Sequence, residues 1–150
     1  MMLSIILLAL LGSAISAVIG TIWYSPATPM GRVHMQYLGF DKLSAEEQKK
    51  QMEKAKPDMP KMYAAQFALS LLTSFAVVFI VTQSLHNGLT LGMAAGFIVM
   101  NWLCFMVPII GSSLLWSNCD RKIVWQKFFS DIACNLVTVL VIALVSGLIV

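Results

Sequence analysis

Charge is absent from most of this chain. Residues 1–31, 62–119 and 132–150 contain no lysine, arginine, aspartate or glutamate. Only 11% of the residues are charged and 59% are hydrophobic, whereas soluble domains carry about 25% charged residues. This composition argues against a water-soluble fold. Because a bilayer core needs about 20 apolar residues per helical span, the three runs accommodate one, two and one spans.

Reactive and metal-binding side chains are also scarce. The chain has 3 cysteines, without a Cys-x-x-Cys pair, and 2 histidines. We therefore expect Cys104, Cys119 and Cys134 to be reduced packing residues and not part of a disulfide framework or a zinc site. No nucleophile stands beside a base, and no glycine-rich phosphate loop follows a strand. The sequence predicts no enzyme, no cofactor and no metal site.

The charged residues that are present are concentrated in two stretches. All 10 lysines and arginines lie within residues 32–61 and 121–127, and the acids lie in or beside these stretches, so that the net charge is +3. Mixed charge suits the headgroups of a lipid bilayer, whereas nucleic-acid binding needs a basic surface of one sign. We expect the bilayer as a partner and no nucleic acid.

The predicted fold is all-α, an integral membrane four-helix bundle in a single domain. Spans are expected at residues 3–24, 62–83, 89–110 and 129–149. A connector, residues 27–61, joins the first two spans. Residues 13–17 look weakly like a signal-peptide cleavage site, but no basic segment precedes them and the apolar run continues beyond them. We therefore expect the first span to be retained.

The connector is predicted to begin as a loop, because prolines and a glycine are frequent over residues 26–31. A helix is expected at about residues 45–56. Ser44 and Glu47 have the spacing of a capping box at its start, and Pro57 ends it. This helix is polar nearly all round, which favours a solvated connector over a helix that lies on the membrane.

The distribution of basic residues predicts the topology. The loops after spans one and three contain all of them, and the turn after span two, with Asn87 and Gly88, contains none. By the positive-inside rule, loops one and three are cytoplasmic and both termini lie outside. The expected location is the plasma membrane or bacterial inner membrane.

Small residues recur at four-residue spacing on two predicted spans. They are Gly12, Ser16 and Gly20 on the first, and Gly88, Gly92 and Gly96 on the third. On a helix this spacing forms a flat groove that a second backbone can approach closely. Packing within one bundle and a dimerisation face for a second copy or another membrane protein both remain open. One groove is expected to serve the bundle, which leaves the other for a partner.

The last predicted span carries a polar stripe of Lys127, Asp131, Asn135 and Thr138. These residues fall within an arc of about 80° on a helix. Asp131 is either a relay for protons or cations, or one partner of an ion pair with Lys127 at the membrane interface. The second interpretation is favoured, because Asp131 lies near the start of the span.

Asn101 lies near the middle of the third predicted span. We expect its side chain to bond across to another helix, as polar side chains in spans commonly do. A substrate cavity lined by Asn101, Trp102 and Asn135 is the alternative to simple helix packing.

Several local patterns resemble the domain of unknown function 1761 family. Trp23-Tyr24-Ser25-Pro26 closes the first predicted span, and Gly31 follows. Met59-Pro60-Lys61-Met62-Tyr63 opens the second span after a helix rich in glutamate and lysine. The family consists of small, predicted four-span membrane proteins without an established activity. The resemblance implies this architecture and supplies no catalytic residues.

Two functional hypotheses remain. The favoured one is a non-enzymatic bundle that acts through oligomerisation or a membrane partner. The other is a small transporter or channel with Asn101, Asp131, Asn135 and Thr138 on its pathway. Small four-span multidrug exporters use a glutamate in their first span, and this first span has no ionisable residue. A water-accessible cavity at Asp131 or Asn135 would favour the transporter, and a solid core would favour assembly.

Overall fold

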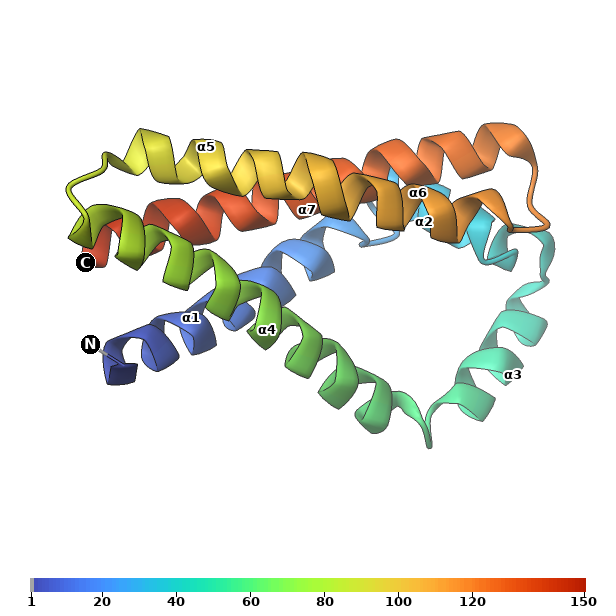
Figure 1. The fold of residues 1–150 in the computed structure, drawn as a ribbon. Helices are drawn as coiled ribbons and strands as arrows, with labels where there is room; N and C mark the ends of the chain where they lie inside the picture. The colour runs from blue at the N-terminus through green and yellow to red at the C-terminus, as the bar shows by residue number, and fades with distance from the viewer. Residues whose placement is uncertain (1) are drawn as a thin grey trace.

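The computed structural model describes residues 2–150, which form helices joined by short turns (Figure 1). Four long helical segments are each apolar enough to cross a bilayer. They are α1 (Met2–Trp23), α4 (Met59–His86), the pair α5 (Leu91–Asn101) and α6 (Val107–Leu115) joined by the π-helical turn η2 (Trp102–Met106), and α7 (Arg121–Ile149). Residues 2–150 contain no strand. The predicted all-α membrane bundle is confirmed.

The connector between α1 and α4 is more helical than its composition predicts. Helix α2 (Pro29–Tyr37) occupies the segment that we expected to be a loop. Thr28 caps this helix, because its hydroxyl accepts a hydrogen bond from the Gly31 backbone N at 2.9 Å, and Pro29 occupies the first helical position. A short turn, η1 (Phe40–Lys42), leads to α3 (Ala45–Ala55). The proline-rich stretch therefore marks a helix start.

The predicted capping box at the start of α3 is confirmed. The backbone N of Ser44 donates to the Glu47 carboxylate at 2.9 Å, and the Glu47 backbone N donates to Ser44 Oγ at 3.3 Å. The hydrogen bonds from Ser44 lower the pKa of Glu47. No residue of α3 is buried, and the helix extends away from the bundle in Figure 1. The helix is thus an exposed connector, and its polar composition still predicts that it lies in water.

The turn between α4 and α5 holds one of the glycines that we placed on a packing face. Gly88 has φ 77°, a left-handed conformation that favours glycine. Helix α5 begins only at Leu91. Gly88 therefore does not lie on a helical face with Gly92 and Gly96, and that prediction was wrong.

The third span changes its winding before Pro108. This proline has no N–H to donate to the preceding turn, and its ring would clash with the carbonyl one turn earlier. The chain adopts the π-helical turn η2 just before it and then continues as α6 to Leu115. Pro108 is thus preceded by a π-helical turn, and the span extends beyond the predicted end at residue 110.

The apolar core fills the half of the bundle that contains both chain ends. One buried cluster consists of Ile5, Leu8, Val77, Val78, Val81, Ala94, Ile98, Val139, Ile142 and Ala143. Next to it, α1 approaches α4 and α7 closely at Gly12. A Cβ added at Gly12 would lie 2.9 Å from Ser74 Cβ and 3.1 Å from Ile142 Cγ2. We call this half, with the termini and the turn at residues 87–90, the uncharged end.

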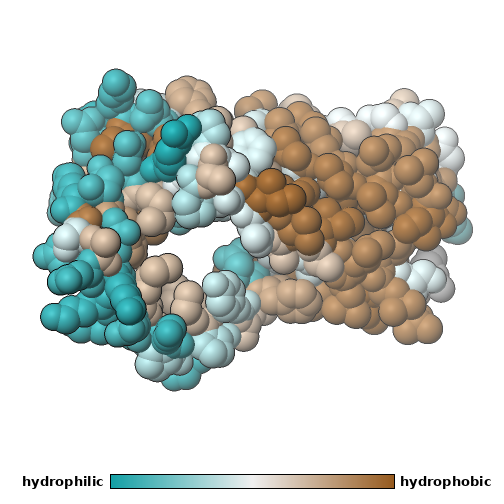
Figure 2. Space-filling model, turned by 180° about the vertical axis from the view of Figure 1, so that it is seen from behind, coloured by the Kyte–Doolittle hydropathy of each residue, from teal (hydrophilic) through white to brown (hydrophobic). Residues whose placement is uncertain are grey.

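We call the opposite half, which carries α2, α3 and the turn at residues 116–120, the charged end. Helix α4 diverges from the other helices there. Residues 60–69 of α4 are all exposed, whereas Ser74, Val78 and Val81 are buried. Figure 1 shows α4 diverging from α1 and α7 toward α3. Figure 2 shows hydrophilic residues gathered at this end, around an opening in the surface. The bundle is closed at the uncharged end and splayed at the charged end.

Candidate solute-binding cavity

A cavity of about 470 Å³ lies where α4 separates from α1 and α7. Three residues of the predicted polar stripe line it, namely Asp131, Asn135 and Thr138. Asn101 does not line the cavity, and its span contributes Met106 and Ile110 instead. The structure therefore brings three of the four predicted pathway residues to one site.

The α7 wall of the cavity is built from hydrogen-bond acceptors. The hydroxyl of Thr138 donates to the backbone O of Cys134 at 2.8 Å, which leaves its oxygen free to accept. Asn135 Oδ1 is buried and has no hydrogen-bond partner among residues 2–150. An unpaired buried polar atom of this kind costs roughly 1–3 kcal/mol.

The facing wall comes from small side chains of α1 and α4. Ser16 Oγ donates to Ser70 Oγ across a distance of 3.5 Å. Ser74 is fully buried, and its Oγ has no partner among the described residues. Gly20 also lines the cavity, and no described atom lies within 4 Å of a Cβ built on it. Gly20 therefore contributes open space, in contrast to the close contact at Gly12.

Ser70, Thr73 and Ser74 of this wall were not identified from the sequence, although a signal was present. Gln66, Ser70, Thr73 and Ser74 line the cavity and are spaced as residues on one face of a helix. A polar face on an otherwise apolar span indicates a buried polar surface or a cavity.

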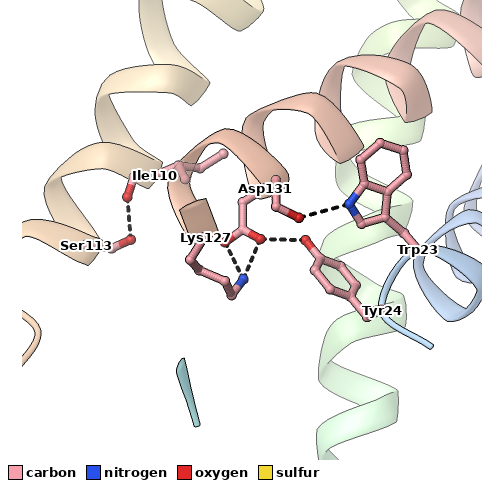
Figure 3. A network of polar contacts seen from close by, with 7 residues as sticks. Trp23, Tyr24, Ile110, Ser113, Lys127 and Asp131 are labelled. Atoms are coloured by element: carbon pink, nitrogen blue, oxygen red, sulfur yellow. Dashed lines mark hydrogen bonds and ion pairs between the residues drawn. The ribbon is translucent and has the colours of Figure 1, made fainter. Parts of the chain in front are cut away.

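Asp131 is held by side chains from two helices (Figure 3). The hydroxyl of Tyr24, which follows α1, donates to Asp131 Oδ1 at 2.7 Å. Lys127, one turn earlier on α7, donates to both carboxylate oxygens. The predicted ion pair is present and largely buried, with side-chain exposures of 8% for Lys127 and 18% for Asp131. Removing one partner of such a pair costs about 3–5 kcal/mol, far more than for an exposed pair.

Aromatic side chains enclose the other side of this ion pair. Lys127 Nζ lies 5.0 Å from the ring centroid of Tyr24 and 5.8 Å from that of Tyr37 on α2. The His34 ring packs against Tyr24, with a centroid distance of 5.0 Å. Burial and Lys127 lower the pKa of His34, against an opposing effect of Asp131. Burial and Asp131 raise the pKa of Tyr24, so its phenol keeps the proton that it donates.

Trp23 and Tyr24 both face α7. Trp23 Nε1 donates to Ser130 Oγ at 3.0 Å, next to the Tyr24–Asp131 hydrogen bond (Figure 3). Both aromatic residues thus anchor the end of α1 to α7 through hydrogen bonds to polar side chains.

Ser25 and Pro26 begin a tight turn that fixes the direction of these two aromatic residues. Thr28 Oγ1 lies 2.7 Å from the backbone O of Trp23 and 2.9 Å from that of Ser25. Gly31 packs directly on this turn, and a Cβ built on it would overlap Ser25 O. The Trp-Tyr-Ser-Pro segment and Gly31 thus fold α2 back against the end of α1.

A sequence model of the family described as "Protein of unknown function (DUF1761)" matches residues 7–147. The chain belongs to this family. No curated protein and no solved structure matches it. The family identification and the four-span architecture that the sequence resemblance implied are both confirmed.

Two other predicted features of this DUF1761 chain lie outside the cavity. Asn101 is exposed, and its side chain donates to the Phe97 backbone O on its own helix at 2.8 Å. The prediction that it bonds to another helix was wrong. Gly92 and Gly96 are exposed on α5, and no described atom lies within 4 Å of a Cβ built on Gly96. These two glycines therefore make no contact that packs the bundle.

Proposed function

We propose that this multi-pass membrane protein binds a small polar solute in the cavity between α1, α4 and α7, as a small transporter or channel. The observation that carries the proposal is the polar lining of this cavity, which includes Asp131 and Asn135 on α7 and Ser70 on α4. In a bilayer, unsatisfied polar groups cost several kcal/mol each, so such a site is retained where water or a solute satisfies it. This reverses the preference from the sequence, because the cavity touches both Asp131 and Asn135.

The shape of the bundle supports access from one side only. The cavity lies on the charged side of the close contact at Gly12, and the apolar core lies on the other side. By the positive-inside rule, the charged end faces the cytoplasm. The proposed binding site therefore opens to the cytoplasm, with both termini outside. The proposal includes no reaction step, since Tyr24 and Lys127 already occupy Asp131.

Thiol labelling tests access to the cavity and the topology together. Single cysteines are introduced at Ser70 in the cavity, Lys50 on α3 and Asn87 in the turn, with the three native cysteines replaced by serine. A membrane-impermeant reagent should label Ser70→Cys and Lys50→Cys from the cytoplasmic face only, and Asn87→Cys from outside only. Leu72→Cys is the matched control, because Leu72 is 68% exposed on the surface of α4 that faces lipid in this proposal.

Two results would contradict this proposal. If Ser70→Cys resists the water-soluble reagent as Leu72→Cys does, the cavity is closed to water and solute binding fails. If Asn87→Cys reacts from the cytoplasmic face, the orientation is inverted.

Oligomerisation through α5 is a second candidate function. The exposed Gly92 and Gly96 are spaced for close approach of a second helix, and the bundle leaves them uncovered. A second copy of this chain would bury them. The two functions are compatible, since the cavity and the α5 glycines lie on different parts of the bundle.

A further inference from the structure

We infer that the cavity selects small organic cations that carry N–H donors, such as primary ammonium and guanidinium compounds, and rejects anions. This inference rests on the proposed function and names its substrate class. It follows from which atoms around the cavity can still accept or donate a hydrogen bond.

Three hydroxyl groups that line the cavity donate their protons to other protein atoms. Tyr24 donates its proton to Asp131, Thr138 donates to Cys134 O, and Thr73 donates to Leu69 O at 3.2 Å. Their oxygens therefore face a solute as acceptors. An ionised carboxylate is also an acceptor only. These three hydroxyls and Asp131 thus favour a solute that donates hydrogen bonds, while Gln66 and Ser70 in the same lining can also donate.

The two walls can hold one head group together. Asn135 lies one helical turn from Asp131 on the same wall, and rotation of its amide presents the oxygen to a solute. On the facing wall, Ser70 Oγ accepts from Ser16 and can also accept from or donate to a solute. An N–H-bearing head group could bond to Asp131 and Ser70 at once, whereas a solute without donors would make no hydrogen bond to Asp131.

The formal charge of the residues that line the cavity indicates that it selects cations over neutral donors and anions. Among the described residues, Asp131 is the one aspartate, glutamate, lysine or arginine that lines it. Lys127 reaches the carboxylate from the side of Tyr24 and Tyr37 and is not part of the lining. An anion would face a carboxylate with no cation in front of it. A cation would instead compete with Lys127 for Asp131, since charge-assisted hydrogen bonds are the strongest available there.

The size of the cavity fits this class of solute. Its volume of about 470 Å³ falls within the range of roughly 300–1,000 Å³ that is usual for small-molecule sites. Part of its lining is apolar, including Leu69 and Ile142. A short alkyl chain attached to the cationic group could pack there.

The test uses four-carbon probes that share one alkyl chain and differ in their head group. Butylammonium and butylguanidinium should bind the purified full-length protein in nanodiscs. Butyltrimethylammonium, which keeps the charge and lacks N–H donors, should bind about tenfold more weakly, and butyrate should not bind. Butyramide is the neutral donor control and should also bind more weakly. Calorimetry measures the affinities.

Two variants test whether Lys127 competes with a bound cation for Asp131 or only stabilises the fold. Lys127→Met removes the internal ammonium, so we expect butylammonium to bind about tenfold more tightly, while Asp131→Asn should abolish binding. Asn135→Leu leaves the ion pair intact and should weaken butylammonium about tenfold at an unchanged Tm. This third variant keeps the test valid if Lys127→Met does not fold.

Each contrary outcome has a defined meaning. Binding of butyrate, or an unchanged affinity in both Lys127→Met and Asn135→Leu, would overturn the inference. Binding of butyramide in preference to the cations would overturn the charge assignment and leave solute binding in place. If no probe binds while Ser70→Cys is still labelled, the cation class is wrong and the open cavity stands. If labelling fails as well, the proposed function falls too.

Discussion

Gly31→Ala should lower the free energy of unfolding by about 3 kcal/mol, the upper part of the range for overpacking. The added Cβ would overlap Ser25 O and lie 2.9 Å from the carbonyl carbon of Tyr24. Both are backbone atoms, so no side-chain rotation relieves the clash. The turn would have to open, and Tyr24 would move away from Asp131. Thermal unfolding in detergent, followed by tryptophan fluorescence, measures the loss.

Gly92→Ala is the matched control for this substitution. The chemical change is the same, but the new Cβ would meet only Thr90 Oγ1, at an ordinary contact distance of 3.7 Å. Alanine is also a better helix former than glycine, so we expect no loss of stability. If Gly31→Ala melts at the same temperature as Gly92→Ala, the turn is not as tightly packed as described.

Gly12→Leu should disrupt the bundle, with a loss of about 3 kcal/mol or more in the free energy of unfolding. Even a methyl group at this position would lie 2.9 Å from Ser74 Cβ and 3.1 Å from Ile142 Cγ2. A leucine would force α1 away from α4 and α7 beside the apolar core. The expected readouts are a lower Tm and labelling of Ser70→Cys from both faces.

The same substitution on α5 separates packing within the bundle from assembly. Gly96→Leu meets no described atom within 4 Å of its Cβ, so the Tm of the monomer should not change. If α5 is a dimer interface, Gly96→Leu should convert dimers to monomers in size-exclusion chromatography with light scattering. A Gly12→Leu protein as stable as Gly96→Leu would contradict the close contact at Gly12. A wild-type monomer would remove the dimer proposal.

The spans could be predicted from the sequence because the bilayer constrains them so strongly. A charge-free run of sufficient length has few alternatives to a membrane-spanning helix, and this chain separates such runs cleanly. The capping box at Ser44 was predictable for a similar reason, since both partners lie within one helical turn. Helix α2 was missed because Pro29 was interpreted as a loop residue. The pair Thr28-Pro29 is equally typical of a helix start.

The candidate site was only partly predictable. The stripe on α7 was visible because its residues share one helix, and Asp131, Asn135 and Thr138 do line the cavity. The contacts of Trp23 and Tyr24 with α7 span more than a hundred positions in sequence. Helical periodicity carries no information on which face of one span meets another. The same limit explains why Asn101 was wrongly expected to bond across to a neighbouring helix.

The divergence of α4 from the bundle gives this helix the geometry of a lever. Its fixed part ends near Ser74, and Met59 lies about 22 Å further along the helix axis at 1.5 Å per residue. Since residues 60–69 are all exposed and none belongs to the apolar core, this arm can tilt without breaking a contact in that core. A tilt of about 5° would shift its end by about 2 Å over that length. Helix α3 is joined to this end of α4. A displacement of α3 would therefore tilt the arm and change the width of the cavity mouth.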